Sequence, residues 1–476
     1  MAPAPLPGGF RLRFGREVRR PVPGVLIGGA PLRVLRLTDA GSALVDRWMS
    51  GGRVGDSRAA ATLAARLVDS GLAAPEPPES PLPPVAVVVP VRDDQSGLEA
   101  TLDALRTTAA GVPVVVVDDG SRPPVDPAGP CPDVIVVRRE VAGGPASARN
   151  TGMRAVPPAT EVAVFVDAGC VPEGPWLARL LAHFTDPAAA AAAPRVSSRA
   201  LSGTPASLAA YEAVRSPLDL GVEPAPVRPG SVVPYVPTAV LAVRASAFRD
   251  VGGFDEAMRF GEDVDFVWRL NRAGWRIRYD PAAGATHPAR TGRRRWLRQR
   301  FDYGRSATPL AVRHGRAVAP LAVSPWSVAV WCLLASGRPV SAAAVTLGSA
   351  EALARRAGGE GAVAAELRRL AVLGTLRAGG PIAAAVRRAW LPPALLAGAV
   401  GWSESAARTR RWILAAAGAV LLGPGLSQWW SWRNRPGAPG PLSSVAWGLA
   451  DDLAYQAGVW DGAIRERSAV ALLPRW

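Results

Sequence analysis

Lysine is absent from this chain of 476 residues, so all 55 residues counted as lysine or arginine are arginine. Against 39 acidic residues they give a formal net charge of +16, a value often seen in nucleic-acid-binding proteins. Arginine in place of lysine, in a chain rich in Ala, Gly and Pro, indicates a GC-rich genome instead. The excess charge therefore fits a phosphate-bearing substrate or an anionic membrane surface, and we expect no nucleic-acid partner.

Cysteine is also scarce. Cys131, Cys170 and Cys332 are odd in number and far apart, and none forms a CxxC pair. This spacing excludes a disulfide framework and a structural zinc site, and it fits a reducing compartment. The first twenty residues lack the apolar core of a secretory signal, so we expect no export.

A chain of this length predicts two or three domains. The clearest boundary is a proline-rich linker at residues 75–84, PEPPESPLPP, which should form neither helix nor strand. Residues 1–74 before it predict a strand-like stretch at 25–37, broken by glycines, and then two helices capped by Thr38 and Ser57. This α+β pattern resembles the PqqD-like, winged-helix-like modules that recognise precursor peptides. A generic winged helix or a packing appendage explains the same residues.

Four valine-rich runs follow the linker, at residues 85–91, 114–117, 134–137 and 162–166. Uninterrupted β-branched runs predict strands buried on both faces of a parallel sheet. Helical segments at 98–109 and 146–155 alternate with them, as in a doubly wound α/β fold. Ligands of such folds bind beyond the carboxyl ends of the strands, where this chain places Arg92, Asp93, residues 118–121 and Asp167.

Five motifs in this region resemble glycosyltransferase family 2 and occur in that family's order: VAVVVPVRDD, VVVVDDGS, GGPASARNTGM, VAVFVDAG and GGFDEAMRFGEDVDFVWRLNRAGWRIRYDP. The resemblance covers about 200 residues. It implies a GT-A catalytic domain at residues 85–306, with a Rossmann-like, mostly parallel sheet, that binds a nucleotide-sugar donor and inverts the transferred sugar.

The donor-binding residues implied by the resemblance lie after the first two strands and at the start of the second helix. The position of Asp119 after a buried strand favours binding of the nucleotide base, although DDGS is also an ordinary turn sequence. A glycine-rich helix start attracts phosphate, but a plain helix cap with a surface arginine has the same sequence. The carried-over donor-site residues are Pro90, Arg92, Asp119, Gly120, Ser121, Arg149, Asn150 and Asp167.

The metal-binding DxD motif of the family is incomplete here, because it reads Asp167, Ala168, Gly169. Carboxylates of this motif normally hold the divalent ion, Mg²⁺ or Mn²⁺, that bridges the donor diphosphate. The missing second carboxylate puts the metal or its usual coordination in doubt. His287 lies where some family members supply a metal ligand, so we expect Asp167 and His287 to bind any metal; an ordinary loop histidine is the alternative.

Three acids, Glu262, Asp263 and Asp265, crowd the start of a predicted amphipathic helix. Such acids usually serve only as partners of the helix dipole. The resemblance, however, implies that one acid of the FGEDVD motif is the general base that takes the proton from the acceptor hydroxyl. An inverting transfer needs one such carboxylate. We assign the base to Asp263, with Glu262 and Asp265 beside it.

Apolar and tryptophan-rich segments fill residues 307–476, where we expect helices. The uncharged stretches 317–336 and 412–430 are long enough to cross a bilayer, and 390–402 is a shorter candidate. Twelve of the 16 tryptophans follow residue 295, as expected for interfacial anchors. The basic segment 290–305 fits a diphosphate, an anionic bilayer or solvent equally well. We expect attachment to the cytoplasmic membrane, with the catalytic domain on the cytoplasmic side; buried soluble helices are the alternative.

The combination of a PqqD-like module, a family 2 domain and this apolar tail resembles the glycosyltransferases of the mycofactocin system. The resemblance is also carried by FDYGRSATPLAVRHG at residues 301–315. It implies transfer of glucose from a UDP donor to a peptide-derived redox cofactor or its precursor peptide. Two alternatives stay open: a membrane-associated enzyme of cell-envelope polysaccharide or lipid-linked sugar, and a non-catalytic scaffold that binds a precursor peptide.

Overall fold

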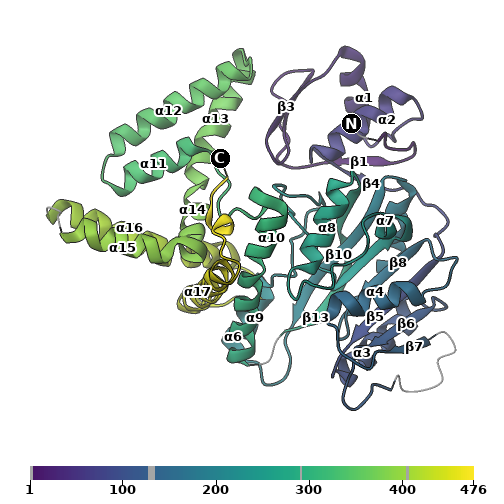
Figure 1. Cartoon of the computed structure of the whole chain (residues 1–476). Helices are drawn as coiled ribbons and strands as arrows, with labels where there is room; N and C mark the ends of the chain where they lie inside the picture. The colour runs from purple at the N-terminus through teal and green to yellow at the C-terminus, as the bar shows by residue number, and fades with distance from the viewer. Residues whose placement is uncertain (1–3, 127–133, 290–291, 404–406, 476) are drawn as a thin grey trace. The chain divides into compact units, whose positions relative to one another are not determined.

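The computed structural model of the chain describes residues 4–126, 134–289, 292–403 and 407–475. The chain divides into two compact units. The first unit comprises Met1–Leu201 and Arg215–Ala289, and the second comprises Ser202–Val214 and Arg290–Trp476. Figure 1 traces the chain in sequence order. Cys131 lies outside the described residues, whereas Cys170 and Cys332 are free thiols.

The N-terminal residues of the first unit form two small antiparallel sheets and two helices. Thr38 accepts a hydrogen bond from the Gly41 amide and Ser57 accepts one from the Ala60 amide, so both predicted caps are confirmed. The elements are β1 (Arg11–Phe14), paired with β4 (Ala73–Glu76), β2 (Val25–Gly28), paired with β3 (Arg33–Arg36), and the helices α1 (Asp39–Met49) and α2 (Arg58–Asp69).

Strand β4 continues into the proline-rich segment, which was expected to exclude strands. Pro75 pairs with Leu12 and Glu76 pairs with Arg11. A two-stranded sheet consists of edge strands only, where a proline can turn its missing N–H side away from the partner strand. The expectation was therefore wrong for these two residues.

One nine-stranded sheet forms the centre of the first unit, in the order β11-β13-β10-β12-β8-β5-β6-β7, with β9 paired to β13. The pairs β6–β7, β5–β6, β5–β8 and β10–β13 are parallel, and β12 runs antiparallel between β8 and β10. The strands are β5 (Val85–Val91), β6 (Val114–Asp118), β7 (Val134–Arg138), β8 (Val162–Val166), β9 (Val171–Glu173), β10 (Ala189–Arg199), β11 (Ala225–Pro226), β12 (Val240–Arg244) and β13 (Arg276–Pro288). The predicted mostly parallel α/β sheet is confirmed.

Helices cover both faces of this sheet (Figure 1). On one face Leu98 of α3 and Leu180 of α5 pack in one buried cluster with the strand valines. On the other face Gly152 of α4 lies against Val88 and Val117 so closely that a Cβ there would stand 2.2 Å from Val88 Cγ1. The helices are α3 (Gln95–Thr108), α4 (Pro145–Ala155), α5 (Trp176–Ala182) followed by η1 (His183–Thr185), α7 (Ala245–Asp250) and α8 (Glu262–Arg272).

Strand β7 differs from its expected burial, and the five strands β9 to β13 were not predicted. Strand β7 is not buried on both faces, because it lies at the sheet edge and leaves Ile135 46% exposed. Strand β10 was not predicted, since it opens with the alanine run Ala189–Ala193, and alanine favours helices. All five alanines are buried, so tertiary packing decides their conformation.

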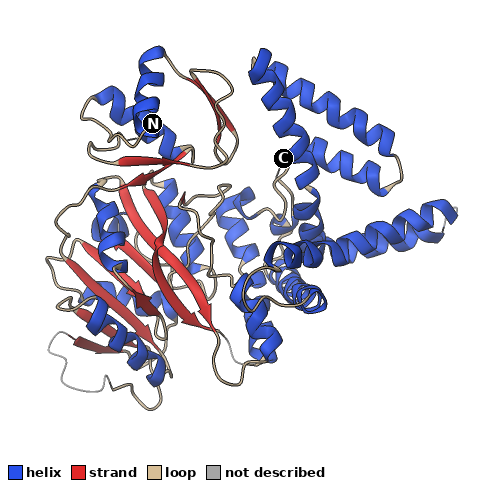
Figure 2. Ribbon diagram, turned by 180° about the vertical axis from the view of Figure 1, so that it is seen from behind, coloured by secondary structure: helices blue, strands red, loops and turns tan. Residues whose placement is uncertain are grey.

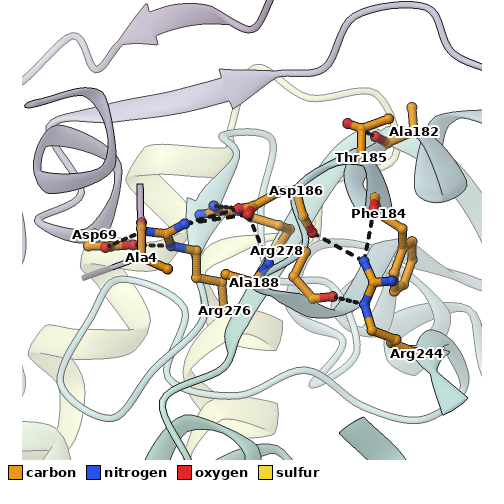
Figure 3. Close-up of polar contacts among 11 residues, drawn as sticks. Ala4, Asp69, Ala182, Phe184, Thr185, Asp186, Ala188, Arg244, Arg276 and Arg278 are labelled. Carbon is orange, nitrogen blue, oxygen red and sulfur yellow. Dashed lines mark hydrogen bonds and ion pairs between the residues drawn. The ribbon is translucent and has the colours of Figure 1, made fainter. Parts of the chain in front are cut away.

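A network of ion pairs joins the N-terminal elements to β13 within the first unit (Figure 3). The guanidinium of Arg276, the first residue of β13, donates from Nε and Nη2 to the carboxylate of Asp69 on α2, at 2.9 Å each. It also donates to the Ala4 carbonyl and contacts the buried carboxylate of Asp186, which Arg278 Nη2 approaches to 3.1 Å. The N-terminal elements are thus anchored by charged groups that are largely desolvated.

The second unit is helical throughout its described part, apart from short connections (Figure 2). Two of its buried arginines form ion pairs: Arg300 contacts Glu212 and Asp451, and Arg387 contacts Asp452 at 2.5 Å. The helices are α6 (Ala206–Arg215), α9 (Arg293–Arg305), α10 (Ala307–His314), η2 (Gly315–Val318), α11 (Pro325–Ala335), α12 (Pro339–Arg356), α13 (Gly361–Arg377), α14 (Gly379–Ala385), the π-helix η3 (Val386–Trp390), α15 (Leu391–Ser403), α16 (Ala407–Trp432), α17 (Pro441–Arg465) and η4 (Val470–Leu472).

The candidate membrane segments differ in structure. Residues 317–336 do not form one helix: prolines at 320 and 325 interrupt them, and α11 has only 11 residues. Among the described residues, one helix, Arg410–Trp432 within α16, is long and apolar enough to cross a bilayer, with a mean hydropathy of 1.2. Length and composition make α16 a candidate and no more.

Candidate active site

The loops that follow β5 and β6 are tied to each other at the carboxyl edge of the sheet. Ser121 Oγ accepts from the Asp93 amide at 2.9 Å, and Asp93 Oδ1 accepts from the Arg122 amide at 2.9 Å. Asp93 has φ +53°, an uncommon conformation for a residue other than glycine. Such local strain is found most often at binding sites, so this loop pair is a candidate for ligand contact.

Of the donor-site candidates in these loops, Pro90 belongs to β5, and Arg92 is exposed with its Nε 3.4 Å from Asp93. Gly120 has φ +74°, and a Cβ there would lie 3.1 Å from the Ala142 amide nitrogen. Only glycine fits this approach of two backbones without strain.

Asp119 anchors the glycine-rich loop before α4. Its buried carboxylate accepts from the amides of Gly143 and Gly144 at 2.9 and 2.8 Å, and from Arg139 Nε at 2.8 Å. The sequence predicts that Asp119 binds a nucleotide base and that the helix start binds phosphate. In the structure these two groups bind each other, a pairing that no local pattern indicates.

Arg149 links two of the predicted acids. Its Nη2 donates to Asp167 Oδ1 at 2.7 Å and its Nη1 donates to Glu262 Oε1 at 3.0 Å, while the guanidinium carbon lies 5.6 Å from the centre of the Phe254 ring. The side chain is only 4% exposed. Burial opposes its charge, but the neighbouring carboxylates outweigh burial and hold the pKa of Arg149 above its usual value. The result is a permanent, immobile cation between α4, β8 and α8.

Asp263 lies in the first turn of α8, and its Oδ1 accepts from the Val264 amide at 2.8 Å. Burial, together with the negative charge of Glu262, raises the pKa of Asp263 to about 7; the Val264 amide and Arg149 oppose this rise. A carboxyl with this pKa can accept a proton near neutral pH, as a general base must. Asp167 and Glu262 both bind Arg149, and the charges of both acids raise the pKa of Asp263. The three acids therefore form one cluster.

Two further candidates have other hydrogen-bond partners. Asp265 is buried, and its Oδ2 accepts from Arg269 Nε one helical turn later at 2.7 Å. Asn150 donates to the Phe254 carbonyl and to Glu256 Oε1, both at 2.9 Å, and accepts from the Phe254 amide at 3.0 Å. Asn150 therefore holds the loop that leads to α8. Sequence reasoning missed Glu256, which also binds Ser147; the GGFDE motif was the available signal.

The side chains present do not fit a divalent ion held by Asp167 and His287. Asp167 is paired with Arg149, and His287 Nδ1 lies 2.8 Å from the Pro288 carbonyl oxygen. Across the described ranges, no group of three or more His, Cys, Asp and Glu side chains is arranged to hold a metal ion. The positive charge held beside Asp167 is the guanidinium of Arg149.

Comparisons with known proteins identify the family of the chain. The family model described as "Glycosyltransferase like family 2" matches residues 83–301. The pre-mycofactocin glycosyltransferase of Mycobacterium tuberculosis is 40% identical over 487 aligned positions, which cover 99% of this chain and 98% of the relative.

More distant relatives match smaller regions or with lower identity. The succinoglycan biosynthesis protein ExoA of Rhizobium meliloti is 34% identical over 98 residues, or 20% of this chain and 29% of that protein. Among solved structures, the mannosyltransferase PcManGT of Pyrobaculum calidifontis in complex with GDP-Man and Mn²⁺ is 18% identical, covers 73% of this chain and 90% of its own, and has a TM-score of 0.38. On the strength of the full-length similarity, the chain is a family 2 glycosyltransferase and belongs to the pre-mycofactocin glycosyltransferase family.

Proposed function

We propose that the chain transfers a sugar, glucose from a UDP donor, to mycofactocin or its precursor with inversion at the anomeric carbon. The observation that carries the acceptor is the 40% identity along nearly the whole length of the pre-mycofactocin glycosyltransferase. An enzyme with an unrelated acceptor would need to resemble this relative only in its catalytic domain. Here the similarity extends through the N-terminal elements and the helical unit.

Asp263 is the general base of the proposed reaction. The acceptor oxygen attacks the anomeric carbon, its proton passes to the Asp263 carboxylate, and the bond from the sugar to the diphosphate breaks on the opposite face. The departing diphosphate needs positive charge, which Arg149 can supply. Glu262 and Asp167 hold Arg149, whereas Asp265 has a structural role through Arg269.

The remaining donor-site assignments are proposals of two kinds. Pro90 lies in β5, and Arg92, Gly120 and Ser121 lie in the loops after β5 and β6; we assign all four to contact with the nucleotide. Asp119 and Asn150 act indirectly, because their side chains bind the glycine-rich loop and the loop before α8.

The experiment is transfer from UDP-[¹⁴C]glucose to purified mycofactocin precursor, with the anomeric configuration of the product read by NMR. We expect a product of inverted configuration from the wild type and a loss of at least about 100-fold in kcat for Asp263→Asn, the lower end for general-base catalysis. Asp103→Asn, an exposed acid on α3 whose side chain is 70% accessible, is the matched control. Equal turnover by Asp263→Asn and the wild type would refute the mechanism.

The same assay separates the two alternatives. A scaffold binds the precursor peptide without transferring sugar, and an envelope enzyme prefers a lipid-linked acceptor. The second alternative draws support from α16, because only 6% of its apolar stretch is buried.

We propose that α16 attaches the enzyme to the cytoplasmic membrane, with the catalytic domain at residues 85–306 on the cytoplasmic side. We also propose that the PqqD-like module at residues 1–74, joined by the linker 75–84, binds the peptide part of the acceptor.

A further inference from the structure

The turn after β8 cannot accommodate the second carboxylate of a DxD motif without strain. Gly169, which occupies that position, has φ +89°, a conformation that L side chains rarely adopt. A Cβ there would lie 3.1 Å from Pro288 Cγ and 3.9 Å from Asp94 Oδ2. An aspartate would therefore meet a proline ring and a like charge as well as backbone strain.

The turn is also fixed in this conformation by hydrogen bonds. The Gly169 amide donates to the Gly97 carbonyl and to Thr101 Oγ1, both at 2.9 Å, and the Cys170 amide donates to the Asp167 carbonyl at 3.0 Å. Thr101 is fully buried in α3. Rotating the turn to a negative φ would break these hydrogen bonds, which include one to the buried Thr101.

The first carboxylate of the motif is already neutralised. Arg149 donates to Asp167 at 2.7 Å, and its other terminal nitrogen is held by Glu262, so both ends of the guanidinium are fixed. Removing Arg149 would leave the Glu262 carboxylate, whose side chain is only 10% exposed, without its cation, and an unpaired buried charge is costly. A metal ion that binds Asp167 would have to compete with Arg149, whose guanidinium cannot be deprotonated in a protein.

From the closed turn and the resident cation we propose that Arg149, and not a divalent ion bound by Asp167, supplies the positive charge at the donor diphosphate. Sugar transfer by this chain then proceeds without a metal at Asp167. This inference rests on the proposed function only in the choice of UDP as the probe. The misfit between Asp167 and a metal ion follows from the neighbouring residues alone.

The test combines two titrations of the full chain. In the first, Mn²⁺ alone is titrated and followed by electron paramagnetic resonance, in wild type and Asp167→Asn. In the second, UDP is titrated calorimetrically with EDTA or with Mn²⁺, in wild type, Arg149→Lys and the control Arg154→Lys. Arg154 is exposed in the last turn of the same helix.

We expect equal Mn²⁺ binding by wild type and Asp167→Asn, and a Kd for UDP that changes less than two-fold between EDTA and Mn²⁺. Arg149→Lys should weaken UDP at least ten-fold with an unchanged circular dichroism spectrum, and Arg154→Lys should not. A Mn²⁺ site lost in Asp167→Asn, or a ten-fold strengthening of UDP binding by Mn²⁺ that requires Asp167, would overturn the proposal. The wild-type comparison decides even where Arg149→Lys does not fold. Absence of UDP binding under every condition would instead refute the donor assignment, and the Mn²⁺ titration would still decide this inference.

Discussion

At the scale of single residues, the active-site acids differ in what their surroundings do to them. Arg149 keeps Asp167 and Glu262 paired, whereas Asp263 accepts a hydrogen bond from the Val264 amide and lies in the field of Glu262. The same cluster therefore provides a fixed cation and a carboxylate that changes charge near neutrality. These are the two electrostatic elements that an inverting transfer requires.

The first prediction concerns the pH dependence of transfer. Because burial and Glu262 raise the pKa of Asp263 to about 7, the base is protonated and inactive in acid. We expect kcat/KM to fall about ten-fold for each pH unit below 7 and to level off above it. Initial rates between pH 5 and 9 check this. A rate that does not vary between pH 5 and 8 would exclude Asp263 as the base.

The second prediction concerns stability and has the opposite sign. Between the ordinary carboxyl range and about pH 7, the folded chain holds a proton that the unfolded chain has released. The free energy of unfolding should therefore decrease as the pH rises through this window. Asp263→Asn cannot ionise, so we expect it to melt above wild type at pH 8 and together with wild type near pH 4. A variant destabilised equally at both values would contradict the argument.

At this scale the sequence predicted which residue types gather at the site, but not which of them form hydrogen bonds and ion pairs with one another. The FGEDVD motif located Asp263, because its order along the chain is a local signal. Nothing local indicates that Asp119 binds the Gly143 and Gly144 amides, or that Arg149 bridges Asp167 and Glu262. These pairs join residues 18 to 113 positions apart, so only the folded chain reveals them.

At the scale of secondary-structure elements, the loop before α8 decides where Asp263 lies. This loop is held to α4 by Asn150 and by Ser147, which contacts Glu256. An amide side chain suits position 150, because Asn150 both donates a hydrogen bond to the Phe254 carbonyl and accepts one from the Phe254 amide.

The third prediction tests this loop. Asn150→Ala leaves the buried Phe254 carbonyl and amide without their side-chain partner, so we expect a loss of about 1–3 kcal/mol in stability. We also expect kcat to fall about ten-fold while KM for the donor changes little, as for an interaction that orients the base in the transition state. Steady-state kinetics and chemical denaturation measure both effects.

The control is Asn271→Ala, whose side chain donates only to the Val267 carbonyl one turn earlier in α8. A rise in donor KM at unchanged kcat in Asn150→Ala would assign Asn150 to direct donor binding instead.

The fourth prediction concerns the anchor of the N-terminal elements. Arg276→Ala removes one of the two arginines that contact buried Asp186, so we expect a loss smaller than the about 3–5 kcal/mol that breaking a buried pair outright costs. Asp69→Asn removes only the partly exposed end of the network and should cost about 1 kcal/mol. Limited proteolysis in residues 77–84 should accelerate in both variants. Equal stability of Arg276→Ala and wild type would mean that Arg278 alone compensates Asp186.

Element prediction succeeded where side-chain chemistry and burial agree. The strands β5, β6 and β8 are β-branched and fully enclosed, so their sequence pattern was sufficient. The sequence also located β7 as a strand but not its exposure, because its valines lie at the sheet edge, and it missed β10, whose alanines have no strand preference of their own.

At the scale of the whole molecule, charge and exposed apolar surface raise the question of membrane contact. Several leucines on α16 are exposed, including Leu414 at 59% and Leu422 at 47%, and arginines lie at both ends of the helix. The sequence located this helix through its uncharged run. The comparable run at 317–336 contains prolines at 320 and 325, and in the structure these prolines divide it.

The fifth prediction is that α16 carries the membrane affinity. We expect the full chain to co-float with anionic vesicles, and Leu414→Ser, Leu422→Ser and Leu426→Ser together to reduce the bound fraction at least ten-fold, since each buried leucine contributes about 1.5–3 kcal/mol. Val141→Ser with Val232→Ser, at exposed valines of the other unit, is the control. Unchanged flotation of the triple variant would remove α16 from the membrane contact.

The alanine run of β10 has a consequence for how this domain can vary. Residues 189–193 lie in the interior of the sheet with at most 1% of their surface exposed. Methyl side chains there set a short spacing between the sheet and whatever covers it, and a close-packed interior offers no free volume for branching. Valine, the residue that strands usually favour, would overfill this layer at a cost of about 1–3 kcal/mol. The domain therefore depends on residues with little intrinsic preference for the strand they form, and size rather than propensity limits what can replace them.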